Sequence, residues 1–156
     1  MDKLVPNSDT FTSQDENKEN STHPNHMASL QQPEFQFSSE PSLERLRAIQ
    51  NRFVSERNWE QFQTPRNLLL ALVAEVGELA EIFQWRGEVA QGLPTFSPAD
   101  REHLGQELSD VFIYLIRLAE VCHVDLPVAA AAKIMHNKAK YPVEKSYGCN
   151  KKYNQL

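Results

Sequence analysis

Two acidic pairs stand out in the sequence, each made of carboxylates three positions apart. The first is Glu75-Val-Gly-Glu78 and the second is Glu107-Leu-Ser-Asp110. Residues three apart share one face of a helix, with Cβ atoms about 5–6 Å apart, so each pair aims two carboxylates in one direction. Carboxylates beside apolar residues require protonation, basic partners or bound cations. No lysine or arginine interrupts either pair, which predicts a site for a hard divalent cation such as Mg²⁺.

Two other interpretations of the acidic pairs have to be weighed. The first is a solvated acidic face, since charged runs usually lie in water and Glu81 extends the first pair. Two pairs on consecutive helices favour cation binding instead, by analogy with helical bundles that carry inward carboxylates. The second is a di-iron or di-manganese redox site, which would need Glu-x-x-His, whereas Glu78 and Asp110 occupy the third position on. All-oxygen ligation favours hydrolysis with Mg²⁺, or with Mn²⁺ in its place.

A basic stripe follows later in the chain, where Lys133, Asn137 and Lys140 fall at i, i+4 and i+7 on one face of an expected helix. Taken alone, such lysines complement the C-terminal end of the helix dipole. Beside an acidic cation site they indicate phosphate binding, because four bare carboxylates would repel a polyphosphate that metal and lysines together neutralise.

Three aromatic residues lie close to the acidic pairs. Trp59 and Trp85 flank the helix of the first pair, and Tyr114 shares a helix face with the second. Such residues are usually part of a core. Their functional use would be stacking on a nucleobase, which contributes about 1–3 kcal/mol per base in nucleic-acid systems. The histidines show no ligand spacing, and the sequence contains neither a P-loop nor a Gly-x-Gly-x-x-Gly motif.

Four helices are expected to position these residues. They cover about residues 43–58, 65–86, 98–123 and 126–140. The expected caps of the first three are Ser42, Thr64 and Ser97, and the fourth begins at Asp125-Leu126-Pro127. Proline at the first helical position strengthens the second and third starts, and Pro142 ends the fourth helix because the residue before a proline leaves helical geometry. No stretch shows strand alternation, so the predicted fold class is all-α.

The second helix carries two features that point beyond a single chain. Residues 68–73 are apolar at successive positions, and such a helix must be buried on all its faces. Four short helices can scarcely bury one of their own members so completely, and residues 128–132 of the fourth helix are similarly apolar, so we infer a homo-oligomer. Gly77, inside a helix, costs about 1 kcal/mol relative to alanine. We expect close approach of another backbone to explain it.

Composition divides the chain into three parts. Residues 1–36 are polar and rich in proline, which predicts a disordered tail; residues 37–143 are the helical domain; and residues 144–156 are a short basic tail. The net charge of −5 disfavours nucleic acid polymers and anionic membranes as partners. Neither a secretory signal nor a membrane-spanning stretch is evident. We therefore expect the cytosol as the location, with the nucleus and mitochondria as alternatives.

The order of these motifs resembles the MazG-like all-α nucleoside triphosphate pyrophosphohydrolases. The resemblance covers about residues 35–143 and rests on Glu-x-x-Glu, a loop, Glu-x-x-Asp and then Lys-x-x-x-Asn-x-x-Lys-Tyr-Pro. Flanking segments such as Arg57-Asn58-Trp59-Glu60-Gln61-Phe62 and Phe83-Gln84-Trp85 are similar to those of family members that act on dCTP.

This resemblance implies a four-helix bundle, assembled as a tetramer, that uses Mg²⁺ to hydrolyse dCTP and base-modified dCTP to dCMP and pyrophosphate. The implied metal ligands are Glu75, Glu78, Glu107 and Asp110. The implied substrate contacts are Trp59 and Trp85 around cytosine, and Tyr114, Lys133, Asn137 and Lys140 at sugar and phosphates. Gln50 is a departure at a substrate-binding position, where the resemblance leads us to expect histidine. As a catalytic hypothesis, Glu75 or Glu78 takes the proton of the attacking water.

Two alternatives stay open from the sequence. An enzyme of broader or dUTP-type selectivity would keep the same site and change the base. A non-enzymatic helical oligomerisation module would leave the acidic stripe in water. The expected partners are a nucleotide and further copies of the chain, with neither a nucleic acid polymer nor a membrane.

Overall fold

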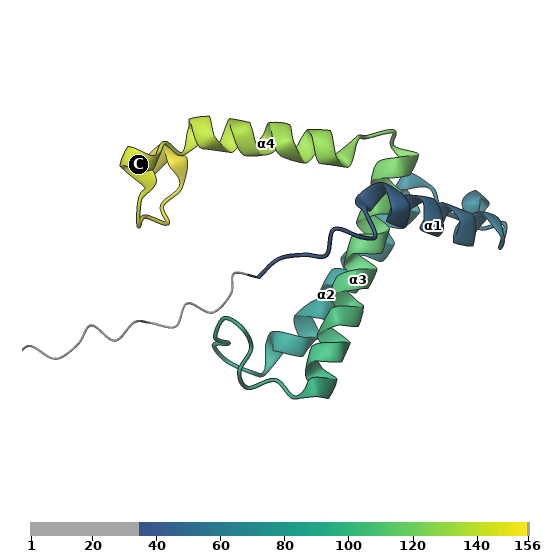
Figure 1. Cartoon of the computed structure of the whole chain (residues 1–156), viewed down its shortest axis with the longest axis horizontal. Helices are drawn as coiled ribbons and strands as arrows, with labels where there is room; N and C mark the ends of the chain where they lie inside the picture. The colour runs from purple at the N-terminus through teal and green to yellow at the C-terminus, as the bar shows by residue number, and fades with distance from the viewer. Residues whose placement is uncertain (1–34, 156) are drawn as a thin grey trace, which may run out of the picture. The chain divides into compact units, whose positions relative to one another are not determined.

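The computed structural model describes residues 35–155, and all regular elements within that range are helical (Figure 1). They are α1 (Leu43–Ser55), η1 (Glu60–Phe62), α2 (Pro65–Gln84), α3 (Pro98–Val121), α4 (Leu126–Lys140), α5 (Val143–Ser146) and η2 (Tyr153–Gln155). The all-α prediction is confirmed, and no described helix is long and apolar enough to cross a membrane. The tail predicted over residues 1–36 lies, apart from its last two residues, outside the described residues.

Each of the four long helices begins where the sequence predicts, and each start is capped. The side chains of Ser42, Thr64, Ser97 and Asp125 accept hydrogen bonds from the backbone N–H groups three residues on. The first three helices end two or three residues earlier than predicted. Asn58 and His123 follow α1 and α3 with φ angles of 53° and 55°, and this left-handed conformation cannot continue a helix.

Helices α1, α2 and α3 enclose the small apolar core. Helices α2 and α3 lie side by side, and α1 packs on α3 (Figure 1). Val54 of α1, Leu68 of α2 and Ile116 of α3 are 2%, 2% and 4% exposed, so each helix contributes one of the most buried side chains. This packing fixes the α2–α3 pair, which carries both acidic pairs.

A single chain leaves much apolar surface uncovered. Extensive packing among the described helices is confined to α2 with α3 and α1 with α3, and α4, described throughout, buries none of its residues. The exposed apolar side chains include Leu69, Leu70 and Val73 of α2, Phe112 and Leu115 of α3, and Val128, Ile134 and Met135 of α4. The apolar face of α2 that we expected to be buried is therefore open in one chain.

The close approach expected at Gly77 is absent among the described residues of one chain. Apart from its chain neighbours and the adjacent backbone of its own helix, a Cβ atom built here would meet no described atom within 4 Å. No neighbouring backbone of the same chain accounts for a glycine here.

Candidate metal site and adjoining cavities

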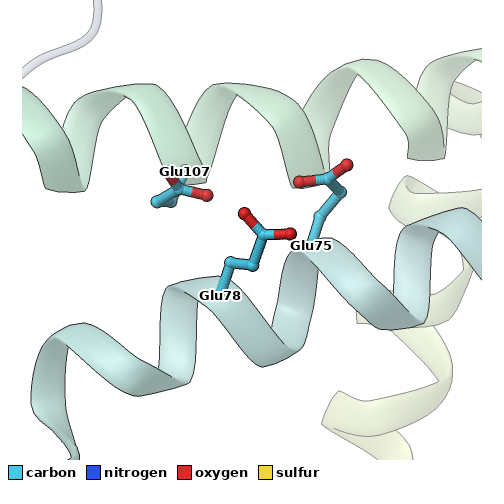
Figure 2. A group of neighbouring side chains, drawn as sticks. All are labelled: Glu75, Glu78 and Glu107. Atoms are coloured by element: carbon cyan, nitrogen blue, oxygen red, sulfur yellow. The ribbon is translucent and has the colours of Figure 1, made fainter.

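Glu75 and Glu78 of α2 point towards Glu107 of α3 (Figure 2). One carboxylate oxygen from each of Glu75, Glu78 and Glu107 lies within 4.8 Å of the other two. This upper limit is slightly wider than the span of two Mg–O bonds of about 2.0–2.1 Å each, which is the largest distance between two oxygens bound to one Mg²⁺. Small side-chain movements would therefore bring the three oxygens onto one cation.

Within this acidic cluster, the charges of the other three predicted ligands act on the Glu75 carboxyl. Burial raises the pKa of the Glu75 carboxyl above its ordinary value, and the charges of Glu78, Asp110 and Glu107 raise it further. Asp110 lies outside the group of three oxygens but acts on the same carboxyl. All four predicted ligands therefore share one electrostatic environment, in which a bound cation would relieve mutual repulsion.

One of the two carboxylate oxygens of Glu107 has no hydrogen-bond partner among the described residues. Its Oε1 lies 3.2 Å from Nε2 of His103. Its Oε2 is buried and has no hydrogen-bond partner among the described residues. An unpaired buried carboxylate oxygen is costly, and an oxygen-only donor set suits a hard divalent cation. The residues present therefore fit a divalent metal ion.

Two cavities of about 530 Å³ each adjoin the acidic cluster. The first, here called the apolar cavity, is lined by Gln50, Phe53, Trp59, Asp110 and Tyr114 among other residues of α1 and α3. The second, here called the acidic cavity, is lined by Glu78, Trp85, Arg86, His103 and Glu107 among others of α2 and α3. The acidic pairs contribute carboxylates to both cavities. In the apolar cavity, the carboxylate of Asp110 shares the lining with flat aromatic side chains.

The two tryptophans predicted to enclose a base are not brought together within one chain. Trp59 precedes α2 and lines the apolar cavity, whereas Trp85 follows α2 and lines the acidic cavity. The 20 residues of α2 correspond to a length of about 30 Å. Trp85 is also 87% exposed. Of the two tryptophans, one chain therefore presents only Trp59 to the apolar cavity.

The basic stripe is likewise separate from the acidic cluster in one chain. Lys133, Asn137 and Lys140 are exposed on α4, and they line neither of the two cavities. The Nζ atom of Lys140 lies 3.7 Å from the ring centroid of Tyr153. Of the predicted substrate contacts, the structure gathers Gln50, Trp59 and Tyr114 around one cavity.

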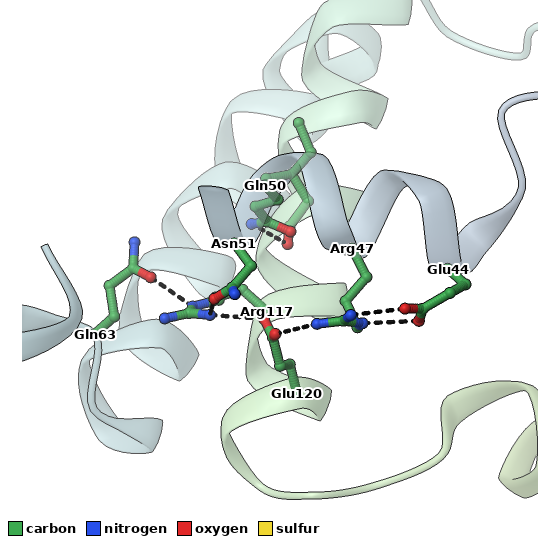
Figure 3. A network of polar contacts seen from close by, with 8 residues as sticks. Glu44, Arg47, Gln50, Asn51, Gln63, Arg117 and Glu120 are labelled. Atoms are coloured by element: carbon green, nitrogen blue, oxygen red, sulfur yellow. Dashed lines mark hydrogen bonds and ion pairs between the residues drawn. The ribbon is translucent and has the colours of Figure 1, made fainter. Parts of the chain in front are cut away.

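A buried polar network beside the apolar cavity was missed by sequence reasoning (Figure 3). Arg117 of α3 is 5% exposed; its Nε donates to Gln63 at 2.7 Å, and its Nη1 donates to Asn51 at 2.9 Å and Glu120 at 2.6 Å. Glu120 also accepts from Arg47 of α1. The network ties α1 and the segment after η1 to α3. Its signal in the sequence was an arginine inside the apolar run of α3.

Comparison with known proteins adds independent observations. The chain matches the MazG-like family over residues 70–156. Over 122 residues it is 53% identical to dCTP pyrophosphatase 1 of Mus musculus and 51% identical to that of Homo sapiens, covering 78% of this chain and 72% of each relative. Its structure is similar to a pyrophosphatase from Archaeoglobus fulgidus, with a TM-score of 0.54 and 30% identity over 69% of this chain and 99% of that one.

Proposed function

Because this chain belongs to the MazG-like family, we propose that it hydrolyses dCTP to dCMP and pyrophosphate. The acidic cluster carries the proposal: three carboxylates have oxygens within 4.8 Å of one another, and Asp110 acts on the same group. Identity of 51–53% with the two dCTP pyrophosphatases supports the substrate. The proposed class is therefore a nucleoside triphosphate pyrophosphohydrolase.

The acidic cluster would hold Mg²⁺, with Mn²⁺ as a substitute, through Glu75, Glu78, Glu107 and Asp110. When bound, the cation supplies positive charge against the triphosphate and a more acidic water. Water attacks the α-phosphorus and pyrophosphate leaves. Glu75 or Glu78 would take the proton of that water.

The apolar cavity is the proposed place for the nucleobase. Trp59 and Tyr114 offer aromatic surface there, and Asp110 connects the cavity to the acidic cluster. A volume of about 530 Å³ lies within the usual range of small-molecule pockets, so the cavity has room for base-modified dCTP. We propose that the protein clears non-standard cytosine nucleotides from the deoxynucleotide pool. The proposed location is the cytosol, with the nucleus and mitochondria as further compartments.

A second copy of the chain would complete this site, and we propose a homo-oligomer, with a tetramer as the assembly that the family resemblance implies. The open apolar faces of α2 and α4 supply surface for the contact. Trp85 and the basic stripe lie apart from the apolar cavity within one chain, so they would act on a nucleotide bound mainly by a neighbour. Lys133, Asn137 and Lys140 would then contact its phosphates.

The decisive experiment removes carboxylate charge without changing shape. We expect Glu78→Gln and Asp110→Asn to abolish Mg²⁺-dependent release of pyrophosphate from dCTP, while circular dichroism shows unchanged helicity. Glu102→Gln is the matched control, because Glu102 is an exposed acidic residue of α3 outside the cluster. Wild-type turnover by Glu78→Gln would refute the assignment of the site.

The two alternatives give different results in the same assays. An enzyme of broader or dUTP-type selectivity would turn over dUTP or dTTP as readily as dCTP. A non-enzymatic oligomerisation module would gain no thermal stability from Mg²⁺ with nucleotide, whereas a ligand at 100 times its dissociation constant adds about 2.7 kcal/mol to the free energy of unfolding.

A further inference from the structure

The chain after α4 turns back on the end of that helix. Helix α4 ends at Lys140, and the backbone N–H of Tyr141 closes its last turn by donating to the carbonyl of Asn137 at 2.8 Å. Gly148, beyond the single turn of α5, has a φ of 65°, a left-handed conformation that glycine adopts without strain. Residues 143–155, here called the returning segment, bring η2 against the last turn of α4 (Figure 1).

The contact is made by the ring of Tyr153, the first residue of η2. The Nζ atom of Lys140 lies 3.7 Å from its centroid, well inside the distance of about 6 Å at which a ring attracts a cation. Tyr141 meets the same ring edge-on, with centroids 6.3 Å apart and an interplanar angle of 84°. This is one of the preferred arrangements of two aromatic rings. Tyr141 thus steadies the ring that holds the Lys140 ammonium.

The contact orients Lys140 and leaves its positive charge uncompensated. The ion pairs formed among residues 35–155 do not include Lys140. A carboxylate partner would neutralise the ammonium, whereas an aromatic ring attracts it through its quadrupole and adds no negative charge. Lys140 is exposed, so the N–H groups that point away from the ring can reach the oxygens of an anion.

We propose that Tyr153 is a positioning residue that holds Lys140 ready for the phosphates of the nucleotide. The inference rests on the proposed function, which gives Lys140 that contact. A lysine side chain that is unrestrained in the free protein loses rotamer freedom when it binds, and this loss weakens binding. The ring of Tyr153 restricts Lys140 before the nucleotide arrives. The returning segment would therefore serve substrate binding although it touches no substrate.

The first test compares KM and kcat for dCTP in wild type, Tyr153→Leu, Tyr153→Phe and Tyr147→Leu. Tyr147 is the matched control, since it belongs to the same segment and is 91% exposed. We expect Tyr153→Leu to raise KM about two- to fivefold with kcat little changed, because an exposed cation–π contact has about this effect on an equilibrium. Tyr153→Phe keeps the ring and should retain the wild-type KM, as should Tyr147→Leu.

Three results of this test would overturn the proposal. An unchanged KM in Tyr153→Leu would mean that the ring does not assist binding. A lower KM would mean that the ring competes with the phosphates for Lys140. A rise in Tyr153→Phe equal to that in Tyr153→Leu would assign the effect to the hydroxyl group instead of the ring.

A double-mutant cycle tests whether Tyr153 acts through Lys140. We expect Lys140→Gln to raise KM, and the addition of Tyr153→Leu to this variant to raise it no further, because the contact has already been lost. A further rise as large as that in the wild-type background would show that the two residues act independently. Such a result would refute the positioning role.

Binding of inorganic triphosphate separates this inference from the proposed reaction. Calorimetry in the presence of Mg²⁺ needs neither a nucleobase nor turnover. We expect Tyr153→Leu to bind triphosphate about two- to fivefold more weakly than wild type and Tyr147→Leu to bind it equally well. Equal affinity in Tyr153→Leu, or no binding by wild type, would overturn the role of Tyr153. The expected difference in a protein that does not hydrolyse dCTP would overturn the proposed reaction alone.

Discussion

Arg117 joins α1 to α3 through a buried polar network. Its guanidinium is buried and bonded to three side chains, one of which is the carboxylate of Glu120. Removing one partner of a buried ion pair usually costs about 3–5 kcal/mol, because the remaining charge loses its compensation. Without Arg117, the partly buried carboxylate of Glu120 would have Arg47 as its remaining basic partner.

We therefore predict that Arg117→Met lowers the free energy of unfolding by about 3 kcal/mol. Arg117→Lys should recover part of the loss, since lysine restores the charge without the planar fork of donors. Urea denaturation measures both changes. Arg45→Met serves as the control, because Arg45 is an exposed arginine of α1 outside this network. A loss below about 1 kcal/mol for Arg117→Met would contradict the central position given to this network.

At the residue scale, the sequence predicted the acidic cluster better than the residues around it. Convergence of Glu75, Glu78 and Glu107 follows from helical spacing on two neighbouring helices, which is a local property. The hydrogen bond from Gln50 to the backbone carbonyl of Ile113 and the burial of Arg117 depend on how α1 packs on α3. Spacing within one helix carries no information on that contact, so these features could not be predicted.

At the scale of elements, the start of α3 depends on a reciprocal cap. The side chain of Asp100 accepts from the backbone N–H and the hydroxyl of Ser97, and it also binds Arg86 beyond the end of α2 at 2.7 Å. These interactions, with the hydrogen bonds from Ser97 foremost, lower the pKa of Asp100 to about 2. The ionised carboxylate therefore stabilises the folded state.

The lowered pKa predicts how Asp100→Asn behaves with pH. Because the folded pKa lies below the unfolded value of 3.8, the stabilisation is complete above pH 3.8 and is lost as the pH falls towards 2. We expect Asp100→Asn to lower Tm at neutral pH, and its difference from wild type to shrink between pH 4 and pH 2. Thermal denaturation across this range measures the difference. A gap in Tm that stays constant down to pH 2 would contradict the role of the charge.

Helix starts were predictable and short turns were not. Caps at Ser42, Thr64, Ser97 and Asp125 are encoded by one side chain and the residues just after it. The single turns of η1, α5 and η2 span three or four residues each, and so few positions give no helical period in the sequence. The ends of α1 and α3 were misplaced because Asn58 and His123 turn the chain in the left-handed region.

At the scale of the whole molecule, the exposed apolar face of α2 gives the most direct test of assembly. Val73 is 61% exposed in one chain. On a free surface, Val73→Glu would change the free energy of unfolding by no more than about 0.5 kcal/mol. On a surface covered by a second copy, the same change buries an unpaired charge.

We predict that Val73→Glu shifts sedimentation of the protein towards smaller species while its helicity is preserved. Arg45→Glu, on an exposed position of α1, should leave the assembly of the wild type intact. Analytical ultracentrifugation at several concentrations measures both variants. An unchanged assembly in Val73→Glu would exclude this face of α2 from the contact.

The sequence also indicated that one chain could not bury all of its own apolar surface. Its signal was the run of apolar residues around Leu69 and Leu70, which remain exposed in the structure. Which copy covers which face could not be predicted, because an apolar surface does not specify its partner.

In the proposed oligomer, the placement of Trp59 and Trp85 at opposite ends of α2 would have a genetic consequence. If each site drew one tryptophan from each of two copies, a chain damaged at one tryptophan would still supply the other to a second site. Chains damaged at different tryptophans would therefore restore some of each other's sites when they assemble together.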